Sequence, residues 1–337
     1  MIRFVLQWHI TERCNLKCTH CYQDEQIIKD ELSLAEKFEV VDKFVDFVKI
    51  LNQNHPSRGI INLTGGEPFI DNELEALLNY ISKFSDLLSF NFLSNGTLID
   101  TKTSLLLQNY RPSYVQISID GDENAHDKIR GVGAFSKAIE GIKKLQNDNI
   151  QVVISFTAHK QNYKEFPKVV KIAKRLKVHK VWSDRLIPEG RAEEKNLQLL
   201  NPQESFKYVK MMKIEQIKNR LNPFSKTIVS AHRALQFIPF LETPHTCTAG
   251  KYLFTLLPNG EVLPCRRMPI RVGNIKNTTF TDIYQKNDLI IKLKTSNGNS
   301  KGCEKCKFTK TCNGGLKCLS YAITGSPFVK DPGCWRN

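Results

Sequence analysis

Three cysteines near the N-terminus have a spacing that suits metal chemistry. Cys14, Cys18 and Cys21 come directly after a β-rich run over Phe4–His9, so we expect them on a loop at the carboxyl end of that strand. Three thiolates on a short loop can hold a [4Fe-4S] cubane, and they leave one iron without a protein ligand. Such an open iron is a position where a substrate can bind. A zinc site is the alternative, but a fourth ligand at zinc spacing is missing from this run.

The C-terminal part of the chain is also rich in cysteine. The chain has ten cysteines, and in a protein that is not exported this favours metal ligation over disulfides. The N-terminal apolar run is too short for a signal peptide, and no stretch of about 18 apolar residues follows it. We therefore predict a cytoplasmic protein without a membrane span. The later cysteines are Cys247, Cys265, Cys303, Cys306, Cys312, Cys318 and Cys334.

The elements that position these cysteines alternate between β-rich runs and helical patterns over residues 1–190, which is typical of parallel βα units. Apolar residues recur at helical spacing from Leu34 to Leu51, and Ser33 is the expected cap of this helix. Six βα units are fewer than the eight of a closed barrel. The sequence therefore predicts an α/β fold with a partial (β/α)6 TIM-like barrel, whose active site lies at the carboxyl ends of the strands. The predicted strands are Phe4–His9, Ile60–Thr64, Leu88–Leu93, Tyr114–Ile119, Val152–Thr157 and Lys180–Ser183, and the later helices are Asn72–Phe84, Thr101–Gln108, Phe135–Asn147 and Tyr163–Leu176.

Two segments follow the barrel. Residues 191–245 are polar, helical in pattern and interrupted by prolines, and we interpret them as a helical bridge. Residues 246–337 combine the later cysteines with glycine and proline turns and few periodic helices. We expect metal, rather than apolar burial, to organise this C-terminal domain.

The Cys14-x3-Cys18-x2-Cys21 spacing, followed by the aromatic Tyr22, resembles the signature of the radical S-adenosylmethionine (SAM) superfamily. The resemblance implies a barrel of the radical SAM type in which these three thiolates hold a [4Fe-4S] cluster. In that family the amino and carboxylate groups of SAM chelate the open iron. An electron delivered through the cluster then cleaves SAM to methionine and a 5′-deoxyadenosyl radical, which abstracts hydrogen from the substrate.

Further motifs occur where the family carries its SAM contacts. Gly65-Gly66-Glu67 follows the second predicted strand and is similar to the family's GGE motif, whose backbone and glutamate receive the SAM amino group. Ser118 and Arg130 resemble the pair that holds the ribose and the methionyl carboxylate. A simple turn or core packing is the alternative role for several of these positions. The SAM-binding residues implied by the resemblance are Tyr22, Gly65, Gly66, Glu67, Asn95, Ser118, Asp120, Arg130 and Ile187.

The order of the later cysteines resembles the SPASM domain, which adds up to two auxiliary [4Fe-4S] clusters to radical SAM enzymes. A fully ligated auxiliary cluster is implied for one set, with a structural zinc ribbon as the alternative. The members of this set are Cys303, Cys306, Cys312 and Cys334.

The second auxiliary cluster has only three cysteines, which are Cys247, Cys265 and Cys318. The family's additional cysteine is missing from Thr248–Leu256. We favour an open iron that could bind substrate. Completion by His245 and loss of this cluster are the alternatives.

The substrate is less well defined by the sequence. The three sets use all ten cysteines, so no free thiol remains to donate a hydrogen atom, and a net oxidation is favoured over epimerisation. SPASM enzymes mostly modify ribosomal peptides or protein side chains, so we predict a peptide-modifying maturase. Sulfatase-maturing members carry an acidic residue where this chain has Arg266, so formylglycine formation is not expected. Arg266 and Arg267 could bind an acidic peptide or a carboxylate, with a surface ion pair as the alternative.

Partners follow from the same resemblance. The first predicted strand starts by Phe4, which leaves no room for a leader-binding domain, so a separate protein or the barrel itself should recognise a peptide. The compact chain also fits a second interpretation, because similar enzymes of haem and haem d1 biosynthesis act on tetrapyrrole side chains, whose propionates suit a basic site. We expect an electron donor such as flavodoxin or ferredoxin.

The formal net charge of +15 raises nucleic acid as a partner. However, lysines such as Lys168, Lys171 and Lys174 are spread along helices without interleaved aromatic residues. We therefore favour a solvated helix face over a nucleic-acid surface. A non-catalytic basic iron-sulfur protein that binds nucleic acid is the alternative of another class.

Overall fold

The computed structural model describes residues 1–23, 30–238, 244–296 and 300–336. These residues form one ten-stranded sheet with the order β10-β9-β8-β1-β2-β3-β4-β5-β6-β7. The strands from β8 through β1 to β7 run parallel to one another, whereas β9 pairs antiparallel with both β8 and β10. The strands are β1 (Ile2–Thr11), β2 (Ser57–Gly65), β3 (Leu88–Ser94), β4 (Val115–Ser118), β5 (Val152–Ala158), β6 (Lys180–Arg185), β7 (Ile228–Ser230), β8 (Leu253–Leu256), β9 (Glu261–Leu263) and β10 (Gly273–Asn274).

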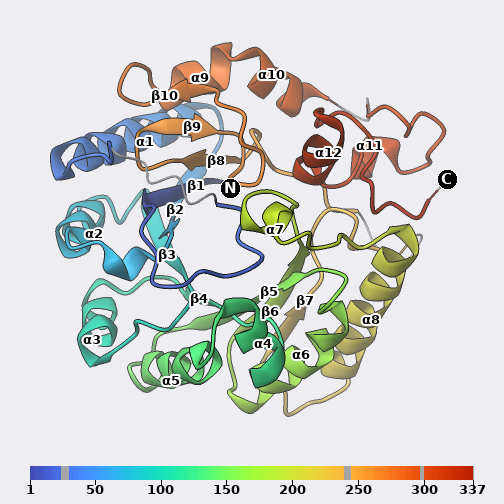
Figure 1. Ribbon diagram of the computed structural model, residues 1–337. Coiled ribbons are helices and arrows are strands. Elements are labelled where there is room, and N and C mark those ends of the chain that lie inside the picture. Colours follow the sequence, from blue (N-terminus) through green and yellow to red (C-terminus); the bar gives the residue numbers. More distant parts are fainter. Residues whose placement is uncertain (24–29, 239–243, 297–299, 337) are drawn as a thin grey trace.

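Helices surround the parallel strands, and the curved sheet encloses the centre of the molecule (Figure 1). Residues after 300 lie beside α8 (Figure 1), where the Phe206 and Trp335 rings are 5.5 Å apart. The helices are α1 (Leu34–Asn54), α2 (Leu74–Ser82), α3 (Thr101–Tyr110), α4 (Glu123–Arg130), α5 (Ala134–Asn147), α6 (Phe166–Arg175), α7 (Arg191–Glu194), α8 (Pro202–Arg220), α9 (Phe280–Lys286), α10 (Asp288–Thr295), α11 (Thr309–Cys312) and α12 (Lys317–Thr324), with short 3-10 turns at Pro68–Ile70 and Tyr163–Glu165.

Local sequence signals explain why these elements form. Ser33 caps α1 in a capping box, in which its hydroxyl accepts from Glu36 N and its own N donates to the Glu36 carboxylate. The predicted strands and helices of the barrel are all present, with ends shifted by a few residues. Helix α4 was not expected because its sequence is strongly polar, and it begins at a cap formed by Asp122, whose side chain accepts from Ala125 N.

The sheet does not end at residue 190. The segment interpreted as a helical bridge contains α7 and α8, and it also contains strand β7, which pairs with β6. Strand β8 of the C-terminal domain pairs with β1 at the other side of the sheet. β7 covers only three residues, which is too short for a period-2 pattern to identify.

Apolar packing also joins the C-terminal domain to the barrel. Phe4 of β1 contacts Phe47 of α1 and Phe254 of β8, with ring centroids 4.8 and 5.2 Å apart, and Phe280 of α9 lies 5.6 Å from Phe44. The rings of Phe4, Phe47, Phe254 and Phe280 are buried in the main core. The expectation that metal alone organises this domain was therefore wrong, because its first half shares the core of the barrel. No helix in the described ranges is both long and apolar enough to cross a membrane.

Candidate active site

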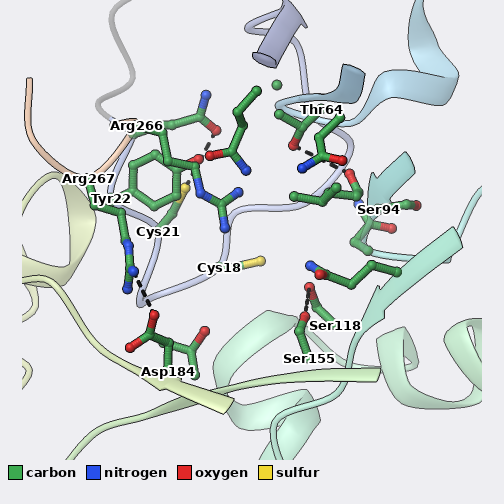
Figure 2. A pocket seen from close by; sticks show the side chains of 18 of the residues that line it. Cys18, Cys21, Tyr22, Thr64, Ser94, Ser118, Ser155, Asp184, Arg266 and Arg267 are labelled. Atoms are coloured by element: carbon green, nitrogen blue, oxygen red, sulfur yellow. Dashed lines mark hydrogen bonds and ion pairs between the residues drawn. The ribbon is translucent and has the colours of Figure 1, made fainter. Parts of the chain in front are cut away.

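The three N-terminal cysteines lie on the loop that follows β1, which we call the cluster loop (residues 12–23). Cys14, Cys18 and Cys21 all line one cavity of about 1100 Å³. Figure 2 shows the sulfur of Cys18 near the centre of this cavity, with Tyr22 and Arg266 on one side and Ser118 on another. The three thiols thus face a common space at the carboxyl end of β1, as the sequence predicts.

The thiols of the cluster loop lie beside groups that favour negatively charged sulfur. Cys18 is buried, and burial raises its pKa, but the Arg130 guanidinium opposes this shift. Two N–H groups point at sulfur: Arg130 Nη1 lies 3.7 Å from Cys18 Sγ, and Leu16 N lies 3.5 Å from Cys14 Sγ. Hydrogen bonds of this kind stabilise thiolate sulfurs, the form in which cysteine binds iron. The three residues therefore fit a [4Fe-4S] cluster with one open iron.

The GGE motif packs directly against the cluster loop. Gly66 N donates to Thr11 O and Glu67 N donates to Arg13 O, both at 2.9 Å. A Cβ on Gly66 would lie 2.2 Å from Arg13 O, so only glycine allows this close approach. Gly65 and Gly66 also line the cavity, which leaves their backbone accessible to a ligand.

Glu67 lies behind this turn rather than on the cavity wall. Its side chain is fully buried, and its carboxylate accepts from Ser94 Oγ and Asn95 N, each at 2.8 Å. Burial raises the pKa of Glu67 to about 7, although these hydrogen bonds oppose the shift. In this structure Glu67 joins the GGE turn to the end of β3, and its contact with the SAM amino group stays a prediction.

Asp120 likewise positions a neighbour instead of lining the cavity. It is completely buried and accepts from Arg130 Nε at 2.6 Å and from Thr157 N at 2.9 Å, while His20 Nε2 lies 3.1 Å from the same carboxylate. Burial alone would raise the pKa of Asp120, but the Arg130 guanidinium and His20 hold it well below its usual value. The ionised Asp120 therefore fixes Arg130 beside Cys18.

The other predicted SAM-binding residues lie around the same cavity. Ser118 is 3.5 Å from Ser155 between their hydroxyl oxygens, and Asn95 Nδ2 donates to Asn15 Oδ1 on the cluster loop at 2.9 Å. The predicted SAM contacts that the structure brings to the cavity wall are Tyr22, Gly65, Gly66, Asn95, Ser118, Arg130 and Ile187.

The second auxiliary set lies in the C-terminal domain, at the side that reaches the cavity through Cys265. Burial, with the neighbouring Cys265 and Cys247, raises the pKa of Cys318 well above its usual value, although Arg267 opposes the shift. Only Cys265 of this set lines the cavity. His245, one alternative fourth ligand, instead has its Nε2 atom 2.8 Å from Nδ1 of His232.

No cysteine of the first auxiliary set lines the cavity. Burial and the neighbouring Cys334 raise the pKa of Cys312 to about 11, and Cys334 and Cys306 contribute after burial to the raised pKa of Cys303. All ten cysteines are free thiols, and their assignment to three cluster sets stays a prediction. Within residues 1–23, 30–238, 244–296 and 300–336, no three His, Cys, Asp or Glu side chains converge at the spacing of a single metal ion.

The two predicted substrate-binding arginines have different environments. Arg267 Nη2 donates to Asp184 Oδ2 at 2.6 Å. The sequence analysis gave an ion pair at the surface as the alternative role for these arginines, and this ion pair is largely buried. Arg266 stacks over the ring of Tyr22, with 5.4 Å from Cζ to the ring centroid. Both arginines line the cavity (Figure 2).

Sequence reasoning missed two other residues that line the cavity. Arg233, from the segment after β7, stacks over the Trp182 ring at 4.2 Å, and both residues line the cavity. Trp182 lies on β6, where inward-facing residues alternate with outward-facing ones, so its direction could have been found from the strand pattern. Arg233 carried no such signal.

Comparison with known protein families agrees with this geometry. Residues 8–173 match the radical SAM superfamily, and residues 247–312 match SPASM, an iron-sulfur cluster-binding domain. The chain belongs to the radical SAM superfamily and carries a SPASM domain. Membership implies an enzyme that uses SAM with [4Fe-4S] clusters.

Individual relatives span almost the whole chain. The Fe-coproporphyrin III synthase of Methanosarcina barkeri is 26% identical over 98% of this chain and 87% of its own length. The AdoMet-dependent heme synthase of Nitratidesulfovibrio vulgaris is 26% identical over 98% and 91%, and the sporulation killing factor maturation protein SkfB of Bacillus subtilis is 27% identical over 81% and 63%. The fold is similar to that of anSMEcpe with bound AdoMet and a peptide, with a TM-score of 0.77, 22% identity and coverage of 98% of this chain and 94% of the other.

Proposed function

We propose that this enzyme oxidatively modifies a carboxylate-bearing substrate that binds in the central cavity. The observation that carries the proposal is that Cys14, Cys18 and Cys21 line the same cavity as Cys265 of the second auxiliary set. When bound, SAM and its cluster supply a hydrogen-abstracting 5′-deoxyadenosyl radical, and an auxiliary cluster supplies a one-electron acceptor. A substrate in this cavity would lie between the two.

The protein's own residues support an oxidation in other ways. The cysteines that line the cavity are Cys14, Cys18, Cys21 and Cys265, and if all four ligate clusters, none of them would be a spare thiol that returns a hydrogen atom to a substrate radical. Arg130, held by Asp120, and the backbone of Gly65 and Gly66 would orient SAM at the cluster loop. Arg266 and Arg233 give the remaining cavity wall a positive charge that suits carboxylates.

A tetrapyrrole is the first substrate candidate. The Fe-coproporphyrin III synthase and the AdoMet-dependent heme synthase described above match over 98% of this chain and over 87% and 91% of their own lengths. Tetrapyrrole propionates would be compatible with the cationic cavity wall, and oxidation of a propionate side chain is compatible with a nearby electron acceptor. This interpretation was the second choice from the sequence, and the extent of these matches moves it to first.

A ribosomal peptide or protein side chain is the second candidate. It is favoured by the similarity to SkfB, a maturation protein, and it is the substrate class that the sequence predicts for a SPASM enzyme. In that case a separate leader-binding protein, or the barrel itself, would recognise the peptide. For either substrate we propose a cytoplasmic enzyme that receives electrons from a flavodoxin or ferredoxin.

The test is turnover by anaerobically reconstituted, reduced full-length protein with SAM. One reaction receives iron coproporphyrin III and another the peptide encoded nearest to the gene, and products are measured by mass spectrometry. Loss of mass from the porphyrin side chains, together with 5′-deoxyadenosine, supports the tetrapyrrole proposal. A changed peptide and an unchanged porphyrin would select the second candidate, and two unchanged substrates would contradict the proposal.

A further inference from the structure

The cavity holds more positive charge than its carboxylates neutralise. Arg233, Arg266 and Arg267 all line it, together with Asp184, which lies in the largely buried end of β6. Asp184 is already engaged, because its Oδ2 accepts from Arg267 Nη2 at 2.6 Å and its Oδ1 accepts from Arg185 N at 2.9 Å. The charges of Arg267 and Arg233 both act on this carboxylate, and its direct ion pair is with Arg267.

Arg233 and Arg266 are held by aromatic rings instead of by carboxylates. Arg233 lies over Trp182 at 4.2 Å and Arg266 over Tyr22 at 5.4 Å. Within the described residues, neither has a carboxylate at ion-pair distance, in contrast to Arg267. Stacking fixes the plane of a guanidinium but leaves its N–H groups available to a planar, bidentate partner such as a carboxylate.

The charges around Arg233 are mostly positive. Arg233 is exposed to the cavity, yet it lies deep enough that burial lowers its pKa, and repulsion from Arg267 and Arg266 lowers it further while Asp184 opposes the shift. Lys180, another cavity residue, also has a lowered pKa because of burial and Arg233. Like charges gathered in one partly buried space are unfavourable unless an anion binds there.

The supporting residues hold the two rings firmly. Trp182 Nε1 donates to Gln116 Oε1 at 3.2 Å, and the Tyr22 hydroxyl lies 3.5 Å from His9 Nε2. Glu12, the acidic residue of the cluster loop that lines this wall, accepts from Gln23 Nε2 at 2.8 Å.

We propose that Arg233 and Arg266 form a two-point carboxylate-binding site that orients an acidic substrate in the cavity, with Trp182 and Tyr22 as the rings that hold them. Arg267 is a structural residue in this arrangement. The inference rests on the proposed function and specifies it, because it assigns a substrate with at least two carboxylates. One carboxylate would bind beside the cluster loop and the other at β6, so the substrate would lie across the cavity.

Binding of coproporphyrin III to the full-length reconstituted protein tests this site without requiring turnover. Fluorescence titration would compare wild type with Arg233→Gln and Arg266→Gln, and with Arg271→Gln as a matched control. Arg271 pairs with Glu261 and is largely exposed, at 74% of its side chain. Iron content and thermal unfolding would be checked for every variant, and Arg233→Lys and Arg266→Lys would retain the charge without the bidentate fork.

Each glutamine variant should weaken porphyrin binding about tenfold or more, which is the size expected for loss of one charge-assisted pair. The lysine variants should recover part of this loss, and Arg271→Gln should bind like wild type. Equal binding by wild type and both glutamine variants, or no binding by wild type, would overturn the inference. Failure of the proposed function would look different. In that case wild type would bind the porphyrin and the glutamine variants would bind it more weakly, but wild type would convert neither the porphyrin nor the peptide.

Discussion

Arg267 of the SPASM domain donates a 2.6 Å hydrogen bond from Nη2 to Oδ2 of Asp184 on β6. The two side chains are 18% and 9% exposed, so the pair links the C-terminal domain to the barrel wall in a largely dry environment. Burial would raise the pKa of Asp184, but Arg267 and Arg233 hold it below its usual value. This link places Cys265, two residues before Arg267, at the wall of the cavity.

Removal of this link should destabilise the protein. Arg267→Gln leaves the Asp184 carboxylate largely buried without its partner, which should cost about 3 kcal/mol of unfolding free energy. As a matched control, Lys49→Ala removes an exposed pair with Asp46 and should cost less than about 1 kcal/mol. Anaerobic urea unfolding would measure both, and equal midpoints for the two variants would contradict a structural role for Arg267.

The contact between the GGE turn and the cluster loop leads to a second prediction. Gly66→Ala places a Cβ 2.2 Å from Arg13 O, which is backbone and cannot move without displacing Cys14. We expect loss of iron from the first cluster and at least tenfold weaker SAM binding, measured by iron analysis and calorimetry. Gly325→Ala is the control, since its Cβ meets nothing within 4 Å, although its φ of 72° costs about 1 kcal/mol. Identical iron content in both variants would argue against the contact.

Glu67 should produce a measurable pH dependence of stability. Burial raises its pKa from 4.5 to about 7, so between these values the folded protein binds more protons at this position than the unfolded chain. Its contribution to stability is therefore most favourable below about pH 4.5 and falls as the pH rises to about 7, by about 3 kcal/mol in total.

The difference between wild type and Glu67→Gln isolates this effect, because every other titrating group is common to both. In the absence of SAM, wild type should lose stability relative to the variant as the pH increases from 4.5 to 7. Thermal unfolding across that range measures the difference. A difference that does not change with pH would mean that Glu67 ionises as it does in the unfolded chain.

Much of the fold was predictable because its signals are local. The capping box at Ser33 and Glu36 and the apolar spacing from Leu34 to Leu51 defined α1, and alternation of βα units defined the parallel sheet. The pairing of β8 with β1 was not predictable, because these strands are separated by the whole barrel in sequence and are joined by long-range contacts, the backbone ladder itself and the packing of Phe254 on Phe4.

In the candidate site, too, residues close together in the sequence were predictable and tertiary contacts were not. Cysteine spacing placed the three cysteines of the cluster loop on the cavity, since ligands on one loop stay close together. The sequence could not distinguish Arg266 from its neighbour Arg267, because only the tertiary position of Asp184 decides which arginine is paired. Arg233 was missed because its partner Trp182 lies about 50 residues earlier in the chain.

The central claim is that the cluster loop holds the cluster that cleaves SAM. It is tested most directly by measuring 5′-deoxyadenosine from SAM with dithionite-reduced, anaerobically reconstituted wild type and the triple variant Cys14→Ala, Cys18→Ala, Cys21→Ala. Wild type should form 5′-deoxyadenosine, whereas the triple variant should form none while it retains iron at the auxiliary sets. Equal formation by both proteins, or zinc instead of iron on the cluster loop of wild type, would contradict the account.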